Sequence, residues 1–217
     1  PTFVDFYAEL TKRNDDDSKL LAREIEMYVV GSLNIFSHPT NIPLNNRIIC
    51  FNTKRLSKQL RTMGMAIIQD FCWNVITRGQ AEKKFTWLYN DEIHLSMKNE
   101  VLSSWLSDTW KRGRKYGVIA TGMTQEAGDV LANRDGRSLV SNSEFLMLYR
   151  QKSSALPMLQ EVIELTAEQC QKLLSYDSGM GIFKVGNSVV EFDSRISENT
   201  KLFQLMQTNV KDKADAE

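Results

Sequence analysis

Two short apolar runs separated by one helical stretch decide the fold: FTWLY at residues 85–89 and YGVIAT at residues 116–121. Residues 94–112, which lie between them, carry apolar side chains at the three- and four-residue spacing of a helix. A strand, a helix and a second strand in this order predict a parallel pair, because the helix returns the chain to the same end of the sheet. Both runs are continuous rather than alternating, which is typical of buried parallel strands.

The same pattern extends outward on both sides. RIICFN at residues 47–52 and FLMLY at residues 145–149 are two further apolar runs, and helical spacing recurs at 54–77 and 125–133. Strands that alternate with helices predict an α/β fold, in which helices flank a parallel sheet.

The two ends of the chain differ from this core. Residues 1–46 are expected to form a helical segment, with helices at 2–12 and 19–30 followed by a loop. Residues 47–195 are expected to form the α/β core, and residues 196–217 a final helix with a charged tail.

The last part of the core carries its own signals. Helical spacing over 153–175 is interrupted near Pro157 and resumes at Thr166, where TAEQ has the pattern of a capping box. Two apolar runs joined by Gly186-Asn187 then predict a β-hairpin with a two-residue turn.

Composition excludes several classes of protein. The 217 residues include 27 Lys and Arg against 27 Asp and Glu, so the chain is not a simple polycation for nucleic acid. Cys50, Cys72 and Cys170 form no CxxC pair, which argues against a disulfide scaffold or a zinc ribbon and favours a reducing cytoplasm. No apolar run approaches the ~18 residues of a membrane span, and no signal peptide is recognisable. The chain starts at Pro1 without Met, which indicates a trimmed start or a piece of a longer protein.

Polar residues follow the two central strands where each ends. Asp91 and Glu92 come after the first strand, and Thr124 and Gln125 after the second. Because the carboxyl ends of parallel strands share one edge, these four side chains are expected to lie together where α/β sheets bind ligands. There an Asp can hold Mg²⁺, a Glu can activate water, and a Gln can contact both water and phosphate. The alternative is that both pairs merely occupy the N-terminal turns of helices.

Three other groups of residues are weaker candidates. The basic run at 110–117 includes Arg114 and Lys115 and should lie at the opposite end of the sheet, facing a neighbouring subunit's nucleotide, a DNA backbone or only solvent. Gln151 follows the run at 145–149 on the first edge, where the two interpretations are a contact with nucleotide and a simple polar strand end. His94 is interpreted as a surface or helix-cap residue.

These motifs together resemble a known family. KFTWLYNDEIHLSM (84–97), WKRGRKYGVIATGMTQ (110–125) and GRSLVSNSEFLMLYRQ (136–151) are similar to the ATPase domain of type IV secretion and conjugative-transfer ATPases. These are the TraC-like proteins, the fourth VirB component, of the HerA–FtsK group. The resemblance covers nearly the whole chain, and its specific part is the order of the motifs.

The resemblance implies a RecA-like core in a ring, such as a hexamer, that uses ATP and Mg²⁺ to drive substrate transfer or pilus assembly. Asp91 and Glu92 match the Walker B pair of the family, with Asp91 as the Mg²⁺ ligand. Gln125, after Thr124, matches a strand-end glutamine. Arg114 and Lys115 match a basic pair with an arginine-finger role.

Two departures from the family pattern stand out. Asn90 replaces an aliphatic residue before Asp-Glu, and no GxxxxGK[ST] occurs in the 217 residues. A P-loop surrounds the phosphates with backbone N–H groups and a lysine. The chain is therefore expected to be the C-terminal part of such an ATPase, inactive alone, with ATP and Mg²⁺ bound only when an upstream P-loop is present.

Two hypotheses from different classes follow. The first is a motor ATPase portion, cytoplasmic or peripheral to the inner face of the membrane, with other secretion components as partners. The second is a non-catalytic α/β module that docks on secretion partners or DNA. Another type of hydrolase is disfavoured, because no Ser, Cys or His nucleophile constellation is evident.

Overall fold

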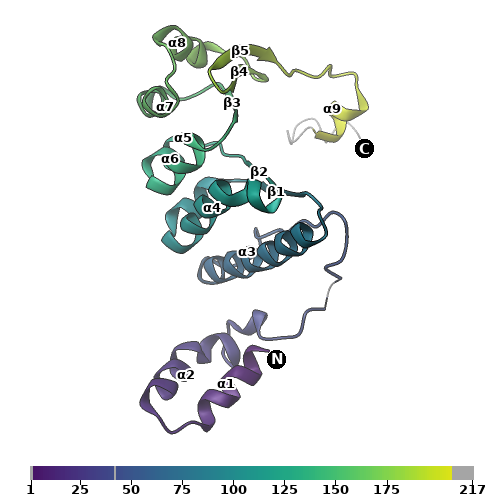
Figure 1. The fold of residues 1–217 in the computed structure, drawn as a ribbon, viewed down its shortest axis with the longest axis vertical. Coiled ribbons are helices and arrows are strands. Elements are labelled where there is room, and N and C mark those ends of the chain that lie inside the picture. The colour runs from purple at the N-terminus through teal and green to yellow at the C-terminus, as the bar shows by residue number, and fades with distance from the viewer. Residues whose placement is uncertain (1, 42, 207–217) are drawn as a thin grey trace. The chain divides into compact units, whose positions relative to one another are not determined.

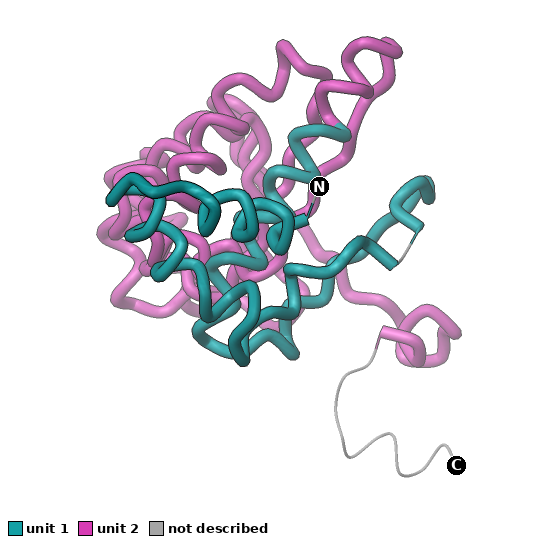
Figure 2. The backbone as a smooth tube through the Cα atoms, turned by 90° about the horizontal axis from the view of Figure 1, so that it is seen from below, with its two compact units in different colours: residues 1–75 teal, residues 76–217 magenta. Residues whose placement is uncertain are grey.

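The computed structural model describes residues 2–41 and 43–206 of the chain. These residues form two compact units, 1–75 and 76–217, which are coloured separately in Figure 2. No helix in the described ranges is both long and apolar enough to cross a membrane.

The first unit is helical, as the sequence predicted for residues 2–30. Helices α1 (Phe3–Lys12) and α2 (Asp16–Val29) contact each other, as the purple end of the ribbon in Figure 1 shows. Thr2 and Asp5 form a capping box at the start of α1, so the first free N–H groups of the helix are satisfied. A short 3₁₀ helix, η1 (Asn34–Phe36), follows α2.

The prediction of a strand at residues 47–52 is wrong. The run carries no strand in the structure, and Ile48 is 84% exposed. A strand needs a hydrogen-bonded neighbour, and within the described residues no segment pairs with this run. The helix expected next is α3 (Lys58–Ala81), which begins four residues later than predicted and continues into the second unit.

The predicted parallel pair is confirmed in the second unit. Strands β1 (Thr86–Asn90) and β2 (Val118–Gly122) pair in parallel, with Thr86 opposite Val118 and Asn90 opposite Gly122. The connection runs through η2 (Ile93–Lys98), α4 (Glu100–Arg112) and η3 (Gly113–Tyr116). The predicted helix at 94–112 is thus divided at Asn99, whose side chain caps α4.

The run at 145–149 is a strand, but it does not join the parallel sheet. This strand, β3 (Phe145–Tyr149), pairs antiparallel with β4 (Met180–Val185), which pairs with β5 (Ser188–Asp193) in the predicted hairpin. Burial alternates along β3, as expected of an antiparallel strand packed on one face only. The described part of the chain is therefore a mixed α/β structure with a two-stranded parallel sheet and a three-stranded antiparallel sheet, and the single flanked parallel sheet predicted from the sequence is not observed.

Further helices complete the described part of the second unit. They are α5 (Ala127–Ala132), α6 (Arg134–Ser141), η4 (Ser153–Ala155), α7 (Leu156–Ile163), α8 (Ala167–Ser175) and α9 (Lys201–Met206). Thr166 and Gln169 form the predicted capping box of α8. Residues 207 and 208 of the predicted final helix and the charged tail lie outside the described residues.

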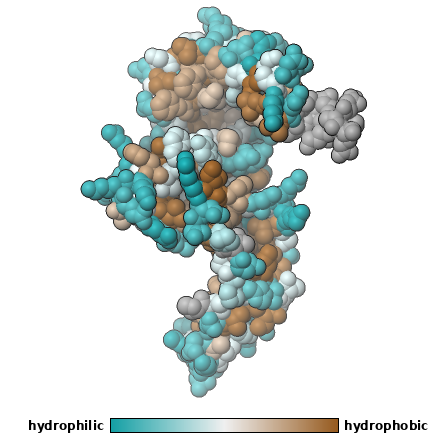
Figure 3. Space-filling model, turned by 90° about the vertical axis from the view of Figure 1, so that its right-hand side faces the viewer, coloured by the Kyte–Doolittle hydropathy of each residue, from teal (hydrophilic) through white to brown (hydrophobic). Residues whose placement is uncertain are grey.

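Two buried clusters hold the second unit together. One joins α7, α8 and the inner face of the antiparallel sheet around Leu159, Leu173 and Ile182. The other lies beneath the ends of β1 and β2 and consists of Ile93, Met97, Leu106, Val130 and Leu139. Other hydrophobic residues remain at the surface, where Figure 3 shows them in brown.

Replacing Leu173 with alanine should lower the free energy of unfolding by about 2–5 kcal/mol, because its side chain is 0% exposed and leaves a cavity. The matched control, Leu205→Ala, removes a side chain that is 74% exposed and should cost less than about 0.5 kcal/mol. Urea unfolding measures both values. Equal losses in the two variants would contradict the placement of Leu173 in the core.

Candidate functional site

Two loops leave the parallel sheet side by side and carry the predicted site residues. The backbone ladder continues past the strands: Met123 N donates to Asn90 O at 2.8 Å, and Ile93 N donates to Met123 O at 2.9 Å. The Ile93 side chain is buried in the second core cluster, which anchors the loop after β1. Gly122 permits this approach, since a Cβ there would lie 2.8 Å from Ile93 Cδ1. The expectation that both strand ends share one edge is confirmed.

Glu92 and Gln125 meet across this edge. Gln125 Nε2 donates a hydrogen bond of 3.0 Å to Glu92 Oε1, so the ends of β1 and β2 are joined by their side chains. Glu92 has left-handed backbone angles, φ 51° and ψ 47°, which cost a residue with a Cβ roughly 1–2 kcal/mol. The fold therefore holds this carboxylate in a conformation that the free chain avoids.

His94 also belongs to this site, which the sequence did not reveal. Its Nδ1 atom lies 3.1 Å from Thr124 Oγ1 and 3.2 Å from Glu92 Oε2. The His94 side chain is only 13% exposed, so it is not a surface residue, and the caps of η2 are Glu92 and Asn99 rather than His94. No spacing pattern in the sequence indicates this contact, because Thr124 is 30 residues away from His94.

Asp91 occupies the tip of the loop after β1. It is exposed, and its Oδ1 accepts a hydrogen bond of 2.9 Å from Glu92 N. Two buried atoms beside it, Asn90 Nδ2 and Glu92 Oε2, have no hydrogen-bond partner within the described residues. For Glu92 Oε2, the contact with His94 has ion-pair distance without hydrogen-bond geometry. Unsatisfied polar atoms at a strand end fit a site that accepts a polar ligand.

The donor set at this edge fits Mg²⁺ only in part. No group of three His, Cys, Asp or Glu residues that could hold a metal ion is found among residues 2–41 and 43–206. Mg²⁺ bound to phosphates needs only one or two protein carboxylates and keeps several waters, and Asp91 satisfies that requirement. The edge therefore fits the Mg²⁺ and terminal-phosphate side of a nucleotide site, but it offers no phosphate cradle.

The prediction that Gln151 lies on the carboxyl edge of the parallel sheet is wrong. It follows β3 of the antiparallel sheet, and its Nε2 donates to Tyr149 O at 3.0 Å. The adjacent Lys152 forms an ion pair of 2.8 Å with Glu126, beside Gln125. The loop after β3 thus approaches the loop after β2 through Lys152, while the Gln151 side chain folds back on its own strand.

Arg114 and Lys115 lie at the opposite end of the parallel sheet, as predicted. Both are exposed in η3, which precedes β2, whereas Asp91 and Gln125 follow the strands. Five strand residues at ~3.3 Å each separate the two ends by about 16 Å. Neither side chain can therefore join the Glu92–Gln125 site within one subunit.

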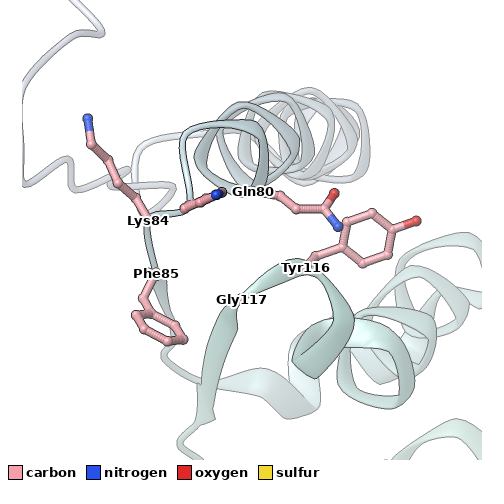
Figure 4. A pocket seen from close by; sticks show the side chains of 6 residues that line it. Gln80, Lys84, Phe85, Tyr116 and Gly117 are labelled. Atoms are coloured by element: carbon pink, nitrogen blue, oxygen red, sulfur yellow. The ribbon is translucent and has the colours of Figure 1, made fainter.

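A shallow cavity of about 170 Å³ opens at this basic end. It is lined by Gln80, Lys83, Lys84, Phe85, Tyr116 and Gly117, as Figure 4 shows. Gln80 Nε2 donates to Lys115 O at 3.0 Å, which joins the end of α3 to η3. Phe85 is 74% exposed, and the neighbouring Lys84 ammonium forms an ion pair of 2.7 Å with Glu82.

Comparisons with known proteins place this fold. No protein-family model and no curated protein matches the sequence. Among solved structures, VirB4 of Thermoanaerobacter pseudethanolicus matches with a TM-score of 0.78 at 21% sequence identity. The match covers 91% of this chain and 55% of the VirB4 chain, so this chain spans about half the length of that protein. The chain therefore has a VirB4-like fold, as the resemblance of its motifs to the fourth VirB component implied.

Proposed function

We propose that this chain carries the hydrolysis residues of a type IV secretion motor ATPase, which couples ATP hydrolysis to substrate transfer or pilus assembly. The observation that supports it best is the Glu92–Gln125 hydrogen bond of 3.0 Å, which joins two parallel strand ends in a VirB4-like fold. The function is tested by the Glu92→Gln variant in a protein that also contains a P-loop, where ATP binding should persist and turnover should fall.

Each residue at the edge has a distinct proposed role. Glu92 orients and deprotonates the attacking water, and Gln125 holds Glu92 and reaches toward the terminal phosphate. Asp91 contacts Mg²⁺ through its water shell, while Thr124 contributes a polar contact to the nucleotide. Bound Mg²⁺ would neutralise the charge of the phosphate oxygens.

The isolated 217-residue chain should not bind ATP–Mg²⁺ with a Kd below about 1 mM. Its sequence holds no P-loop, and without that cradle the phosphates lack the backbone N–H groups and the lysine that bind them. Isothermal titration calorimetry measures the affinity. Micromolar binding to the isolated chain would contradict the proposal that ATP binding requires a P-loop outside these 217 residues.

The proposed partners follow from the same function. Other type IV secretion components and further copies of this chain in a hexameric ring would surround it, at the cytoplasmic face of a membrane. In such a ring Arg114, with Lys115 beside it, would face the nucleotide of the next subunit. The planar guanidinium fits phosphate oxygens better than the point charge of a lysine does.

A second candidate function is favoured by the basic end of the sheet. Lys83, Lys84 and the exposed Phe85 ring combine positive charge with a stacking surface, which suits a nucleic-acid strand.

A third type of activity, a thiol hydrolase, has no support at Cys72. Burial raises the pKa of its thiol, so it is not an activated nucleophile.

DNA binding at the basic end has a specific signature. Affinity for a fluorescent single strand should fall steeply between 50 and about 200 mM salt, since bound phosphates release counterions. The double variant Lys83→Ala/Lys84→Ala should reduce the salt slope by about two, while Lys19→Ala in α2 leaves it unchanged. Fluorescence anisotropy measures both effects. Equal slopes in the two variants would exclude this end as the binding site.

A further inference from the structure

His94 lies where it can control the Glu92 carboxylate. Its ring comes from η2, directly after the loop that carries Glu92, and its Nδ1 is within 3.2 Å of both Glu92 Oε2 and Thr124 Oγ1. The buried Ile93 between the two residues fixes the backbone from which both side chains extend. One ring nitrogen thus contacts residues from the ends of both parallel strands.

The location of the His94 proton follows from these contacts. Glu92 Oε2 can only accept when ionised, and it has no hydrogen-bond donor within the described residues. A bare Nδ1 would place its lone pair against this buried oxygen, whereas a protonated Nδ1 attracts it. We infer that His94 is a positioning residue, whose Nδ1–H donates to Thr124 Oγ1 and presents its positive end to the Glu92 carboxylate at ion-pair distance.

This arrangement restrains Glu92 on both of its oxygens. Gln125 Nε2 donates to Oε1, and His94 Nδ1 lies 3.2 Å from Oε2, close enough for its charge to attract that oxygen. The carboxylate is then held by one hydrogen bond and one electrostatic contact, in addition to the left-handed backbone of its own residue. A general base that acts on one water molecule requires such a fixed orientation.

The same proton also determines what Thr124 can do. Thr124 Oγ1 already accepts a hydrogen bond of 3.0 Å from Glu126 N, and Nδ1–H supplies the second donor. A hydroxyl has two acceptor positions and one proton, so both acceptor positions are filled. The Thr124 O–H is therefore left to donate outward, toward a ligand oxygen such as that of a phosphate.

Nuclear magnetic resonance on the isolated chain tests the proton location without any activity. His38 and His94 are the two histidines of the sequence, so a His38→Gln variant assigns the ring signals. At about pH 8.5, where an ordinary imidazole is neutral, His94 should show a protonated Nδ1, while His38 should favour a protonated Nε2. A His94 ring with a bare Nδ1 would overturn the inference.

A matched pair of variants tests the positioning role. Asparagine places an N–H donor near the position of Nδ1, whereas phenylalanine keeps the ring without a donor. The Gln125 side-chain amide signals should stay unchanged in His94→Asn and move to the positions of a free amide in His94→Phe. Unchanged Gln125 signals in His94→Phe would mean that the histidine does not hold the carboxylate.

The consequence for catalysis rests on the proposed function. In a P-loop-containing protein, His94→Phe should slow turnover about 10–100-fold, as loss of a residue that orients a ligand or base does, and His94→Asn should restore most of it. In a protein that already carries Glu92→Gln, adding His94→Phe should not lower turnover further, because the carboxylate that His94 positions is no longer present. Full loss on that background would overturn the positioning role. If Glu92→Gln itself leaves turnover unchanged while the resonance results hold, the proposed function fails and the His94–Glu92 contact stands.

Discussion

Replacing Glu92 with glutamine is expected to slow ATP turnover by roughly 10²–10⁴ and to leave ATP binding intact, in a protein that joins this chain to a P-loop. Glutamine keeps the size of the side chain and its hydrogen bond to Gln125, but it cannot take a proton from water. The loss therefore falls on the chemical step. Steady-state turnover and nucleotide affinity, measured on the same preparation, separate the two quantities.

A matched control makes the result specific. Glu168 lies in the first turn of α8 with a side chain that is 79% exposed, so Glu168→Gln makes the same chemical change away from the site. It should leave turnover unchanged. Equal rates for Glu92→Gln and Glu168→Gln would return Glu92 to the role of an acidic residue in a tight turn.

Arg114→Ala is expected to lower turnover by about 10³ through the neighbouring subunit. Arg114 lies at the end of the parallel sheet opposite Glu92, so it can reach only the nucleotide of another copy. Mixing Arg114→Ala with Glu92→Gln, each inactive alone, creates some interfaces in which an intact Arg114 faces an intact Glu92. Turnover should partly return in the mixture.

One result of the mixing experiment would contradict the role of Arg114. If subunits exchange, as shown by fluorescent labels, and no activity returns, Arg114 does not act across the interface. Lys115→Ala is tested next, since Lys115 lies beside Arg114 and carries a charge of the same sign. Lys111→Ala, in the last turn of α4, serves as the control with an exposed cation outside η3.

Local signals in the sequence predicted much of the fold. The strand, helix and strand order over 85–121 gave the parallel pair, and TAEQ at Thr166 gave the start of α8. Pairing partners could not be predicted in the same way. RIICFN at 47–52 has the composition of a strand, but no segment among residues 2–41 and 43–206 pairs with it. Strand β3 is apolar throughout although only one of its faces is packed. The helix α6, capped by Asn133, was not predicted, because its 8 residues contain too few apolar side chains to show a helical repeat.

In the candidate site, too, the sequence predicted what local patterns determine and missed what depends on pairing between distant segments. Asp91, Glu92, Thr124 and Gln125 were expected to meet because the ends of parallel strands must share an edge, and the structure brings Glu92 and Gln125 together. Gln151 depended on the pairing of β3, which the sequence could not specify. His94 was missed because its partner Thr124 is 30 residues away, and a lone histidine carries no spacing signal.

The turnover of the double variant Glu92→Gln/Gln125→Ala tests most directly whether these two residues act as one catalytic unit. Residues that share one contact and one step are not additive, so removing the second after the first should change little. We expect the double variant to turn over ATP within about twofold of Glu92→Gln alone. Multiplication of the two single losses would show that the residues act independently and would contradict the proposed site.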